Sequence, residues 1–369
     1  MKLVKIMRFT FMCRDKPESI GVKVAIIGAG PAGLSAAGYL VCHGYDVDIY
    51  DKLPLPGGLM IFAIPPWRIS REAVMGGIKE LEEKFGVKFI LRTKVYSGTK
   101  PVHEEGDEFV EKTISLEQLI EEYDVVLITT GTWRSRIPRI PGIEAKGVYT
   151  ALEYVYQHRL YELGLRKEPP HRGEKVIVIG GGYSAVDAAE QAFKNGAETY
   201  LVYRRTVKQA PAGLYEIERI RRLGVNVIEL ASPVEVIVEN GVAKGVKFQR
   251  MKLGPPDESG RPRPIPIPGS EFTLEADTVV FATGERSTPP VSPEDKEALE
   301  KLGIELTKWN TIVVNNNMQT GNPKVFAAGD VVNGPSKLGP AVGSGLRAAR
   351  SLDYWMRARR LKLIPLPRS

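Results

Sequence analysis

Cysteine and long apolar runs are both scarce in this chain of 369 residues. The two cysteines, Cys13 and Cys42, allow at most one disulfide and form no CxxC motif. A thiol redox pair, a zinc site or an iron–sulfur cluster held by this chain alone is therefore not expected, and no metal site is predicted. No stretch approaches the ~20 apolar residues of a membrane span. Lys5 and Arg8 interrupt the apolar start of the chain, which argues against a signal peptide, and a cytoplasmic location is the default expectation.

The charge balance is only moderately basic. Lysine and arginine number 51 and aspartate and glutamate 44, which gives a net charge of +7. No basic helix with interleaved aromatic residues stands out, so nucleic-acid binding is not predicted. The excess fits an ordinary solvated surface, with anionic ligands or an acidic protein partner as the alternatives.

One pattern occurs twice in the sequence. Residues 23–52 and 175–205 each predict a buried strand, a glycine turn, an Ala-rich helix and a second strand. Three further buried strands are expected within 123–132, 276–285 and 323–332. The proline-rich residues 254–270 predict a surface loop or hairpin excursion, because proline is barred from central strands. The repeat indicates an α/β protein with two dinucleotide-binding lobes.

The first glycine turn contains Gly28, Gly30 and Gly33. The first glycine permits the tight turn, the second lets the backbone approach a pyrophosphate, and the third lets the helix pack closely on the strand. The start of that helix supplies N–H groups and partial positive charge to phosphates. Asp51, 23 positions after Gly28, suits a ribose diol and would repel a phosphate.

The second turn contains Gly180, Gly182 and Ala185, with Tyr183 and Ser184 between them. Its second strand ends in "VYRR", where the first lobe has "IYDK". Arg204 is 24 positions after Gly180 and takes nearly the place of Asp51. Guanidinium groups match phosphate oxygens and stay charged. Arg204 and Arg205 therefore predict that the second lobe holds NADPH in preference to NADH.

The last part of the sequence indicates a flavin on the first lobe. Asp330, after Gly329, ends a buried strand and can accept a hydrogen bond from a ribityl hydroxyl. A helix expected to begin near residues 339–342 would direct its positive end at the flavin ring. Two dinucleotides, one bound firmly and one exchanged, are thus predicted.

These motifs together resemble the two-dinucleotide-binding-domain flavoproteins. "GAGPAGL", "VFAAGDV" and "YDKLPLPGGLMIFAIPPWRIS" are similar, more narrowly, to the glutamate synthase small-subunit group, over about residues 20–355. The resemblance implies that Gly57, Gly58 and Leu59 approach the FAD, with Arg68 a further contact and Val95 near the adenine. It also implies that Gly284 lies near the nicotinamide. Tyr183 departs from the asparagine that the group often has there.

The complete set of predicted site residues follows from these motifs and from the resemblance, with no acid–base residue nominated because the cofactors carry the chemistry. The predicted FAD contacts are Gly28, Gly30, Pro31, Ala32, Gly33, Asp51, Lys52, Gly58, Leu59, Arg68, Val95, Thr130, Gly131, Gly329, Asp330, Ala341 and Val342. The predicted NADPH contacts are Gly180, Gly182, Tyr183, Ser184, Ala185, Arg204, Arg205 and Gly284.

The predicted architecture inserts the NADPH-binding domain (146–285) into a discontinuous FAD-binding domain (21–145 and 286–355). A lead-in (1–20) and a basic tail (356–369) flank them, and Cys42 is expected to be a packing residue of the first lobe's helix. The predicted function is hydride transfer between NADPH and FAD. Relatives usually carry a preceding iron–sulfur domain; here only about 20 residues precede the flavin lobe.

The electron relay is therefore expected from an iron–sulfur partner subunit or ferredoxin, within a possible hetero-oligomer. Two alternatives remain open: a stand-alone NADPH-dependent reductase of a small acceptor such as a quinone or a sulfur compound, and a non-catalytic flavin-binding subunit. A disulfide reductase is disfavoured because its cysteine pair is absent.

Overall fold

The computed structural model describes residues 13–98, 102–258 and 260–361. The chain divides into two compact units, one formed by residues 1–134 with 286–369 and the other by residues 135–285. The first boundary lies 11 residues before the one expected from the sequence (134 against 145), and the second is the same. Two short strands, β7 (Arg134–Ser135) and β16 (Glu285–Arg286), pair where the chain passes between the units.

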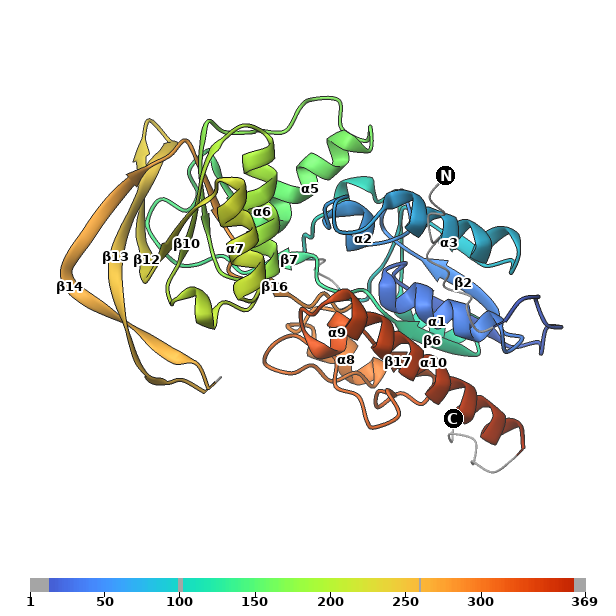
Figure 1. The fold of residues 1–369 in the computed structure, drawn as a ribbon. Helices are drawn as coiled ribbons and strands as arrows, with labels where there is room; N and C mark the ends of the chain where they lie inside the picture. Colours follow the sequence, from blue (N-terminus) through green and yellow to red (C-terminus); the bar gives the residue numbers. More distant parts are fainter. Residues whose placement is uncertain (1–12, 99–101, 259, 362–369) are drawn as a thin grey trace. The chain divides into compact units, whose positions relative to one another are not determined.

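The first unit is built on a five-stranded parallel sheet in the order β17-β6-β1-β2-β3 (Figure 1). Its strands are short and almost wholly apolar, as expected for a parallel sheet covered on both faces. They are β1 (Lys23–Ile27), β2 (Asp46–Tyr50), β3 (Lys88–Ile90), β6 (Val125–Ile128) and β17 (Val325–Ala327). A small two-stranded sheet, β4 (Thr93–Val95) with β5 (Lys112–Ile114), accompanies them.

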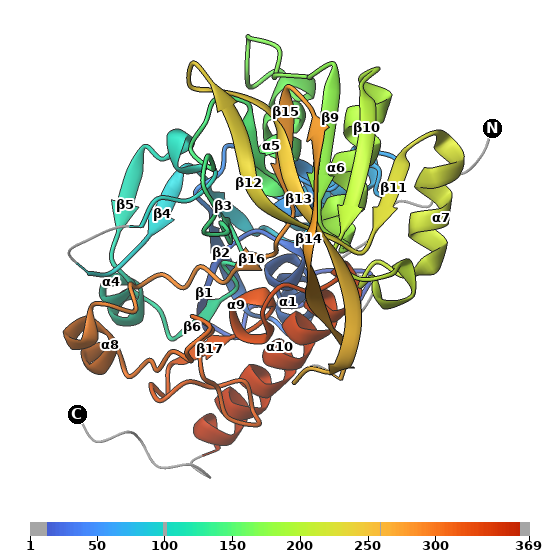
Figure 2. The ribbon, with the colours of Figure 1, turned by 90° about the vertical axis from the view of Figure 1, so that its left-hand side faces the viewer.

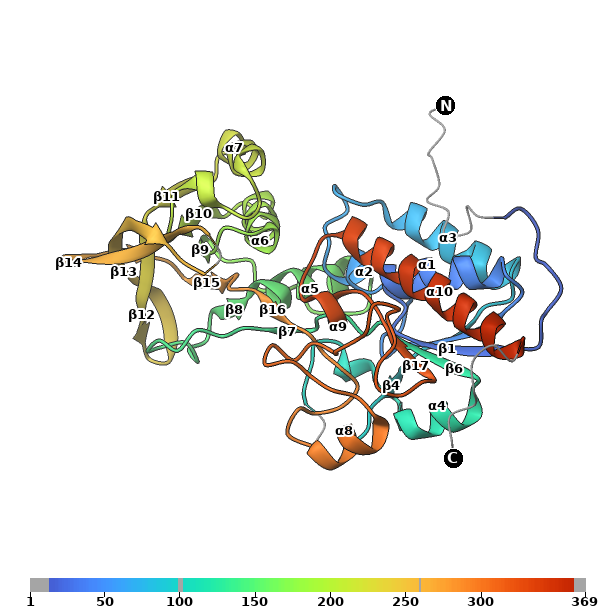
Figure 3. The same ribbon diagram turned by 90° about the horizontal axis from the view of Figure 1, so that it is seen from below.

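Helices of the first unit pack on this sheet and on each other. Figure 3 shows α1 (Pro31–Val41) alongside α10 (Leu338–Arg360). The approach is close: a Cβ on Gly345 of α10 would lie 2.1 Å from the carbonyl oxygen of Ala32. The remaining helices are α2 (Leu59–Phe62), α3 (Arg71–Glu83), α4 (Leu116–Glu122), α8 (Lys296–Leu302) and α9 (Asp330–Asn333), with a 3₁₀ turn at Asp107–Phe109.

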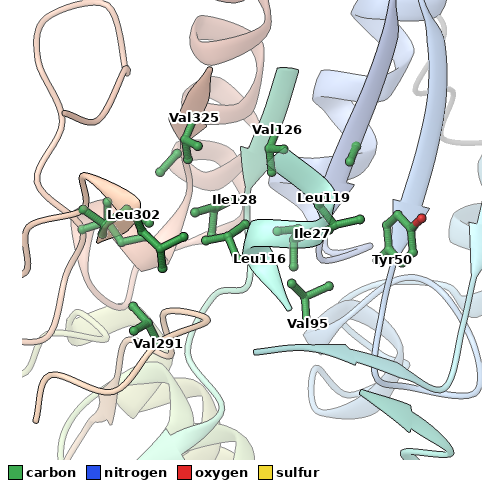
Figure 4. Packing of buried hydrophobic residues seen from close by; sticks show 14 of the residues in the cluster. Ile27, Tyr50, Val95, Leu116, Leu119, Val126, Ile128, Val291, Leu302 and Val325 are labelled. Atoms are coloured by element: carbon green, nitrogen blue, oxygen red, sulfur yellow. The ribbon is translucent and has the colours of Figure 1, made fainter. Parts of the chain in front are cut away.

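The core of the first unit joins segments that are far apart in the sequence. Apolar side chains from β1, β6 and β17 meet those of α4 and α8 and of the chain that follows β16 (Figure 4). The buried members include Ile27, Leu116, Leu119, Val126, Ile128, Val291, Leu302 and Val325. Residues after 286 therefore complete the sheet that residues 23–128 begin, which is why the second unit is an insertion into the first.

The second unit repeats the parallel sheet, here in the order β11-β10-β9-β15-β8. Its strands are β8 (Val148–Thr150), β9 (Lys175–Ile179), β10 (Glu198–Tyr203), β11 (Asn226–Glu229) and β15 (Thr278–Phe281). Its helices are α5 (Ala151–Glu162), α6 (Tyr183–Lys194) and α7 (Leu214–Leu223), with a 3₁₀ turn at Val207–Gln209.

A three-stranded antiparallel sheet completes the second unit (Figure 2). Its strands are β12 (Ala231–Glu239), β13 (Val242–Pro256) and β14 (Pro262–Glu275). The proline-rich segment forms the distal half of the β13–β14 hairpin, and β14 is an edge strand, so the predicted hairpin excursion is confirmed. The predicted α/β fold with two nucleotide-binding lobes is also confirmed.

Both chain ends differ in part from the expectation. The predicted basic tail begins inside α10, because Arg357, Arg359 and Arg360 form the last turn of that helix. Lys362 and Arg368 lie outside the described residues, as do residues 1–12 of the lead-in. Within the described part of the chain, none of the helices has the length and apolar character needed to cross a bilayer.

Candidate functional site: two dinucleotide-binding turns

The first glycine turn joins β1 to α1 under tight steric limits. Gly28 has φ +107°, and a Cβ there would lie 2.5 Å from the carbonyl oxygen of Thr129 on the neighbouring strand end. A Cβ on Gly33 would lie 2.1 Å from the carbonyl oxygen of Gly28. A Cβ on Gly30, in contrast, would meet no atom within 4 Å. The first and third glycines therefore serve the packing of the turn, whereas the second leaves space beside the backbone.

Asp51 is fixed immediately after β2 by two backbone groups. Its carboxylate accepts hydrogen bonds from Ala29 N (2.6 Å) and Leu53 N (2.9 Å), and the residue is 8% exposed. Burial raises the pKa of Asp51, and the two backbone hydrogen bonds oppose that rise. Each carboxylate oxygen can accept a further hydrogen bond. The side chain is thus held in place with capacity left for a ligand diol.

Two adjoining cavities lie at this end of the sheet. Both are lined by Gly28, Asp51, Thr130 and Trp133, so they form one continuous site. The first also has a polar lining from β2, β4 and residue 104. The second extends along the start of α1 to the start of α10. The predicted FAD residues that line one or both cavities are Gly28, Gly30, Pro31, Ala32, Asp51, Lys52, Gly58, Leu59, Val95, Thr130, Gly131, Asp330 and Ala341.

Four predicted FAD residues do not line either cavity. Gly33 packs beneath the turn, as described above. Gly329 donates its N–H to Ser344 Oγ (2.9 Å), and the carbonyl oxygen of Val342 accepts a hydrogen bond from Ser35 Oγ (3.1 Å). Arg68 follows Pro65 in the loop after α2, where its N–H bonds to the Pro65 carbonyl oxygen (3.0 Å). The first three support the residues that form the cavity walls.

Sequence reasoning missed part of the lining. The residues concerned are Ile27, Tyr50, Thr93, Lys94, Tyr96, Glu104, Thr288, Pro289 and Pro290 in the first cavity, Met60, Ile64, Thr129, Thr132, Ser336, Lys337 and Leu338 in the second, and Trp133 in both. Trp133 was within reach of a sequence argument, since it stands two residues after Gly131 in a strand-end motif. Glu104 carried no such signal.

A buried ion cluster closes one side of the first cavity. Lys52 Nζ lies 2.6 Å from Glu104 Oε2 and 3.5 Å from Asp107 Oδ1, and Lys94 Nζ lies 2.8 Å from Asp107 Oδ2. The ammonium group of Lys52 also lies 5.1 Å from the centre of the Trp133 ring. The two lysines balance the two carboxylates. They tie residues 104–107 to the sheet beside the cavity.

Asp330 and the start of α10 form the far side of the second cavity. The Asp330 carboxylate accepts hydrogen bonds from Ser336 Oγ (2.5 Å) and Ser336 N (3.2 Å). Burial raises the pKa of Asp330, and the hydrogen bonds from Ser336 oppose that rise. The cavity is also lined by Lys337 and Leu338, the cap and first residue of the helix. The positive end of the helix dipole therefore lies at the cavity, as expected.

The chemistry of this site fits FAD. Thr130 Oγ1 is buried and has no hydrogen-bond partner among the described residues, although it lines both cavities. A buried hydroxyl without a partner costs free energy, so a polar ligand group beside it would be stabilised. The site also has a carboxylate at each end, Asp51 and Asp330, and the open space beside Gly30 at the start of α1. An elongated ligand with two polyol segments and a pyrophosphate between them satisfies all of these features.

The second glycine turn joins β9 to α6 in the same way. A Cβ on Gly180 would lie 2.5 Å from the carbonyl oxygen of Ala282. A Cβ on Gly182 would meet nothing within 4 Å, and Ala185 is fully buried. Ser184 Oγ donates to Glu285 Oε1 (2.9 Å). Gly284 has φ +99°, and its carbonyl oxygen accepts a hydrogen bond from Arg136 N (2.8 Å). The backbone beside Gly182 is thus open to a ligand.

The hydrogen-bond register sets which residues of the two lobes correspond. Gly28 N donates to the Tyr50 carbonyl oxygen (2.7 Å), and Gly180 N donates to the Val202 carbonyl oxygen (3.0 Å). Tyr50 and Val202 are therefore equivalent, and the counterpart of Asp51 is Tyr203. The spacing of 23 and 24 residues hides this shift because β10 is one residue longer than β2.

Tyr203 fills the place that Asp51 has in the first lobe. Its ring lies against Gly181, where a Cβ would come within 2.6 Å of the ring. The next residue, Arg204, corresponds to Lys52 and is exposed. Partial burial and the charge of the neighbouring Arg205 lower the pKa of Arg204. The second lobe thus has an exposed guanidinium group at its strand end and no carboxylate in the ribose position.

Arg205 is placed differently from Arg204. It is 2% exposed, and its guanidinium group donates to Asp257 Oδ2 (2.5 Å) and to the carbonyl oxygen of Pro262 (2.7 Å). The two arginines were predicted as a pair of phosphate contacts. In the structure only Arg204 presents its side chain at the surface of the strand end.

The two cysteines form a disulfide, which is a correction to the prediction for Cys42. Cys42 caps the C-terminal end of α1, and its sulfur is bonded to that of Cys13 rather than only packed in the core. Neither cysteine lines either cavity. In the described ranges of the chain, His, Cys, Asp and Glu side chains do not gather in groups of three that would suit a metal ion.

Comparisons with known proteins agree with this geometry. Residues 22–345 match the family described as pyridine nucleotide-disulphide oxidoreductase. The chain is 34% identical to the putative oxidoreductase AegA of Escherichia coli (92% of this chain, 50% of AegA). It is 38% identical to the NADP(+)-dependent formate dehydrogenase subunit beta of Moorella thermoacetica (91% and 44%). It is 36% identical to the glutamate synthase [NADPH] small chain of Halomonas elongata (90% and 68%), so the predicted resemblance to that group is confirmed.

Among solved structures, FprA of Mycobacterium tuberculosis in complex with NADPH has the same fold. The TM-score is 0.72 at 19% identity, over 96% of this chain and 88% of FprA. The chain spans about half the length of AegA and of the formate dehydrogenase subunit. The predicted cofactors, FAD and a nicotinamide dinucleotide, are those of the matched family. On these grounds the chain belongs to the pyridine nucleotide-disulphide oxidoreductases.

Proposed function

We propose that this chain transfers hydride between NADPH and FAD and exchanges the electrons with an iron–sulfur partner. The observation that supports this most directly is the unequal pair of strand ends after the two glycine turns. One ends in a buried carboxylate beside an enclosed cavity, and the other ends in an exposed guanidinium group. The first suits a dinucleotide that stays bound, and the second suits one that carries a 2′-phosphate and exchanges.

On the first lobe, the residues bind and orient the flavin nucleotide. Asp51 accepts the hydroxyl groups of the adenosine ribose, and the start of α1 faces the pyrophosphate. Thr130 and Asp330 hydrogen-bond the ribityl chain. The N-terminal end of α10 contributes positive potential to the ring. When bound, FAD supplies the hydride and single-electron chemistry, which no side chain of the protein provides.

On the second lobe, the residues select and position the nicotinamide nucleotide. The N-terminal end of α6 faces the pyrophosphate, with Gly182 leaving room for it. Arg204 binds the 2′-phosphate. NADH lacks that phosphate, and Tyr203 offers no carboxylate to its ribose diol. NADPH is therefore preferred.

The proposed partner is an iron–sulfur subunit or a ferredoxin. Several of the similar proteins are named as subunits, among them the NADPH-Fe(3+) oxidoreductase subunit beta of Geobacter sulfurreducens. The group that the sequence resembles usually carries iron–sulfur clusters beside its flavin lobe. An acidic partner would also complement the basic balance of this chain, +7 overall. Docking of that kind is faster at low salt.

An anaerobic titration tests the core of the proposal. The purified protein should be yellow, should release FAD on denaturation, and should lose its flavin absorbance when NADPH is added. Release of FMN would contradict the role of Asp51, because FMN has no adenosine. Failure of NADPH to bleach the flavin would favour a non-catalytic flavin-binding subunit.

Purification from the native host tests the partner. Identification of co-purifying chains should reveal an iron–sulfur protein, and adding it should accelerate NADPH oxidation in a salt-dependent manner. Full-rate turnover of a small physiological acceptor by the isolated chain, with no partner in native extracts, would instead support a stand-alone reductase.

A further inference from the structure

The tip of the β13–β14 hairpin is held at the end of β10. The tip, residues 257–262, is closed by two backbone hydrogen bonds: Asp257 N to the Arg261 carbonyl oxygen and Gly260 N to the Asp257 carbonyl oxygen, each 2.8 Å long. Pro256 and Pro262 form the last pair of the ladder before the tip. The tip is therefore a defined turn within the second unit.

Arg205 connects this tip to the strand end. Its Nη2 donates to the Asp257 side chain and its Nε to the Pro262 carbonyl oxygen, so one guanidinium group bridges both sides of the tip. Its own carbonyl oxygen accepts a hydrogen bond from Leu230 N (3.2 Å). Because Arg205 is almost fully buried, these contacts are shielded from solvent. The tip is thereby fixed beside the residue that precedes Arg205, which is Arg204.

The charges gathered here do not balance. Arg205 and Arg261 both lower the pKa of Arg204, which places three guanidinium groups near one another, whereas Asp257 acts in the opposite direction. Asp257 is already paired with Arg205. The carboxylate of Glu229, at the end of the neighbouring strand, accepts the N–H of Val207 (2.5 Å). Two positive charges, on Arg204 and Arg261, therefore remain to face an anion.

We propose that the hairpin tip is the second wall of the 2′-phosphate site, with Arg261 as a specificity residue opposite Arg204. The proposal rests on the proposed NADPH site and extends it to a segment remote in sequence. A phosphate monoester carries about −1.5 to −2 charges at neutral pH, which two guanidinium groups match. Arg205 is then a positioning residue: it holds the tip in place and does not itself contact the phosphate.

Binding of adenosine 2′,5′-bisphosphate, compared with AMP, tests the proposal directly by calorimetry. Loss of one charge-assisted contact in Arg261→Ala should weaken bisphosphate binding about tenfold or more and leave AMP binding unchanged. Arg263→Ala is the matched control, since Arg263 is an exposed arginine of the same hairpin. It should leave the affinity for both ligands unchanged. Flavin content and the unfolding transition show whether each variant is folded.

A double-mutant cycle tests the positioning role of Arg205. Asp257→Asn removes the charge that pairs with Arg205, so the tip should loosen and bisphosphate binding should weaken. If the tip acts only through Arg261, combining Asp257→Asn with Arg261→Ala should be no worse than Arg261→Ala alone. In turnover, these variants should raise KM for NADPH and leave kcat unchanged.

The outcomes separate this proposal from the proposed function. A wild-type chain that does not distinguish the bisphosphate from AMP would overturn both. A wild-type chain that does, with equal losses in Arg261→Ala and Arg263→Ala or no loss in either, would overturn the role of the tip and leave the NADPH site standing. Fully additive losses in the cycle would overturn the positioning role of Arg205.

Discussion

The two glycine turns are nearly the same structure with opposite charges at the end of the second strand. Each turn has one glycine that a Cβ would drive into a neighbouring carbonyl oxygen and one that faces open space. In the first lobe, the following residue is a carboxylate bound to two backbone N–H groups. In the second, it is a tyrosine ring, and the charge comes one residue later. The same backbone can therefore hold two dinucleotides, and the residue at one strand position decides which.

The largest expected effect concerns the third position of the turn, where the lobes already differ. Gly33→Ala would place a Cβ 2.1 Å from the Gly28 carbonyl oxygen, in backbone that has little freedom to move. We expect the overpacking to cost about 1–3 kcal/mol or more and to abolish FAD retention. Flavin content after gel filtration and denaturant unfolding measure this.

The matched change in the second lobe is Ala185→Gly. It removes a buried methyl group from a helix and should cost about 1–2 kcal/mol, with FAD content unchanged. Equal effects of the two substitutions would show that α1 and α6 approach their turns equally, contrary to the structure.

The second prediction removes the carboxylate of the first lobe. Asp51→Ala leaves the N–H groups of Ala29 and Leu53 without their acceptor, at about 1–3 kcal/mol each, and removes the proposed ribose contact. FAD affinity should fall about tenfold to a hundredfold, measured by flavin fluorescence during reconstitution. Tyr203→Phe is the control in the corresponding position and should leave FAD binding intact. Undiminished FAD affinity in Asp51→Ala would remove the basis for assigning the first lobe.

The third prediction removes the charge of the second lobe. Arg204→Ala should weaken NADPH binding about tenfold to a hundredfold with little effect on NADH, because only NADPH has the 2′-phosphate. Dissociation constants for both nucleotides, from anaerobic titration, give the ratio. Equal losses for NADPH and NADH would refute the phosphate role. The counterpart in the first lobe, Lys52→Met, leaves Glu104 buried without its closest partner and should reduce FAD retention without changing this ratio.

Local patterns in the sequence were enough to predict both turns, since the steric limits on Gly28 and Gly180 arise within a few residues of each. The register between the lobes was not predictable from spacing. Arg204 was matched to Asp51, and only the hydrogen bonds of Gly28 and Gly180 reveal the shift by one residue. Glu104 and Arg261 were missed for a related reason. Both lie outside the strand–turn–helix pattern, and only the fold brings them to the strand ends.

The different placing of Arg204 and Arg205 has a similar origin. The sequence predicts two adjacent arginines at a strand end, but it does not show that the hairpin tip, more than 50 residues later, supplies Asp257 and buries one of them. The disulfide was also beyond prediction, because two cysteines 29 residues apart can be bonded or free, and only the folded lead-in brings Cys13 to the end of α1.

The smallest expected effect on activity concerns that disulfide, which distinguishes the first unit from the second because both cysteines of the chain belong to the first. Neither sulfur lines the FAD cavities, so replacing Cys13 and Cys42 together with alanine should leave NADPH-driven flavin reduction essentially unchanged in stopped flow. Stability should respond instead. Loop-closure entropy for a separation of 29 residues predicts a loss of about 3–4 kcal/mol in the unfolding of the first unit. Treating the wild-type protein with a thiol-free reductant before the measurement should reproduce both results. A tenfold or greater slowing of flavin reduction, with FAD still bound, would instead mean that this disulfide takes part in electron transfer.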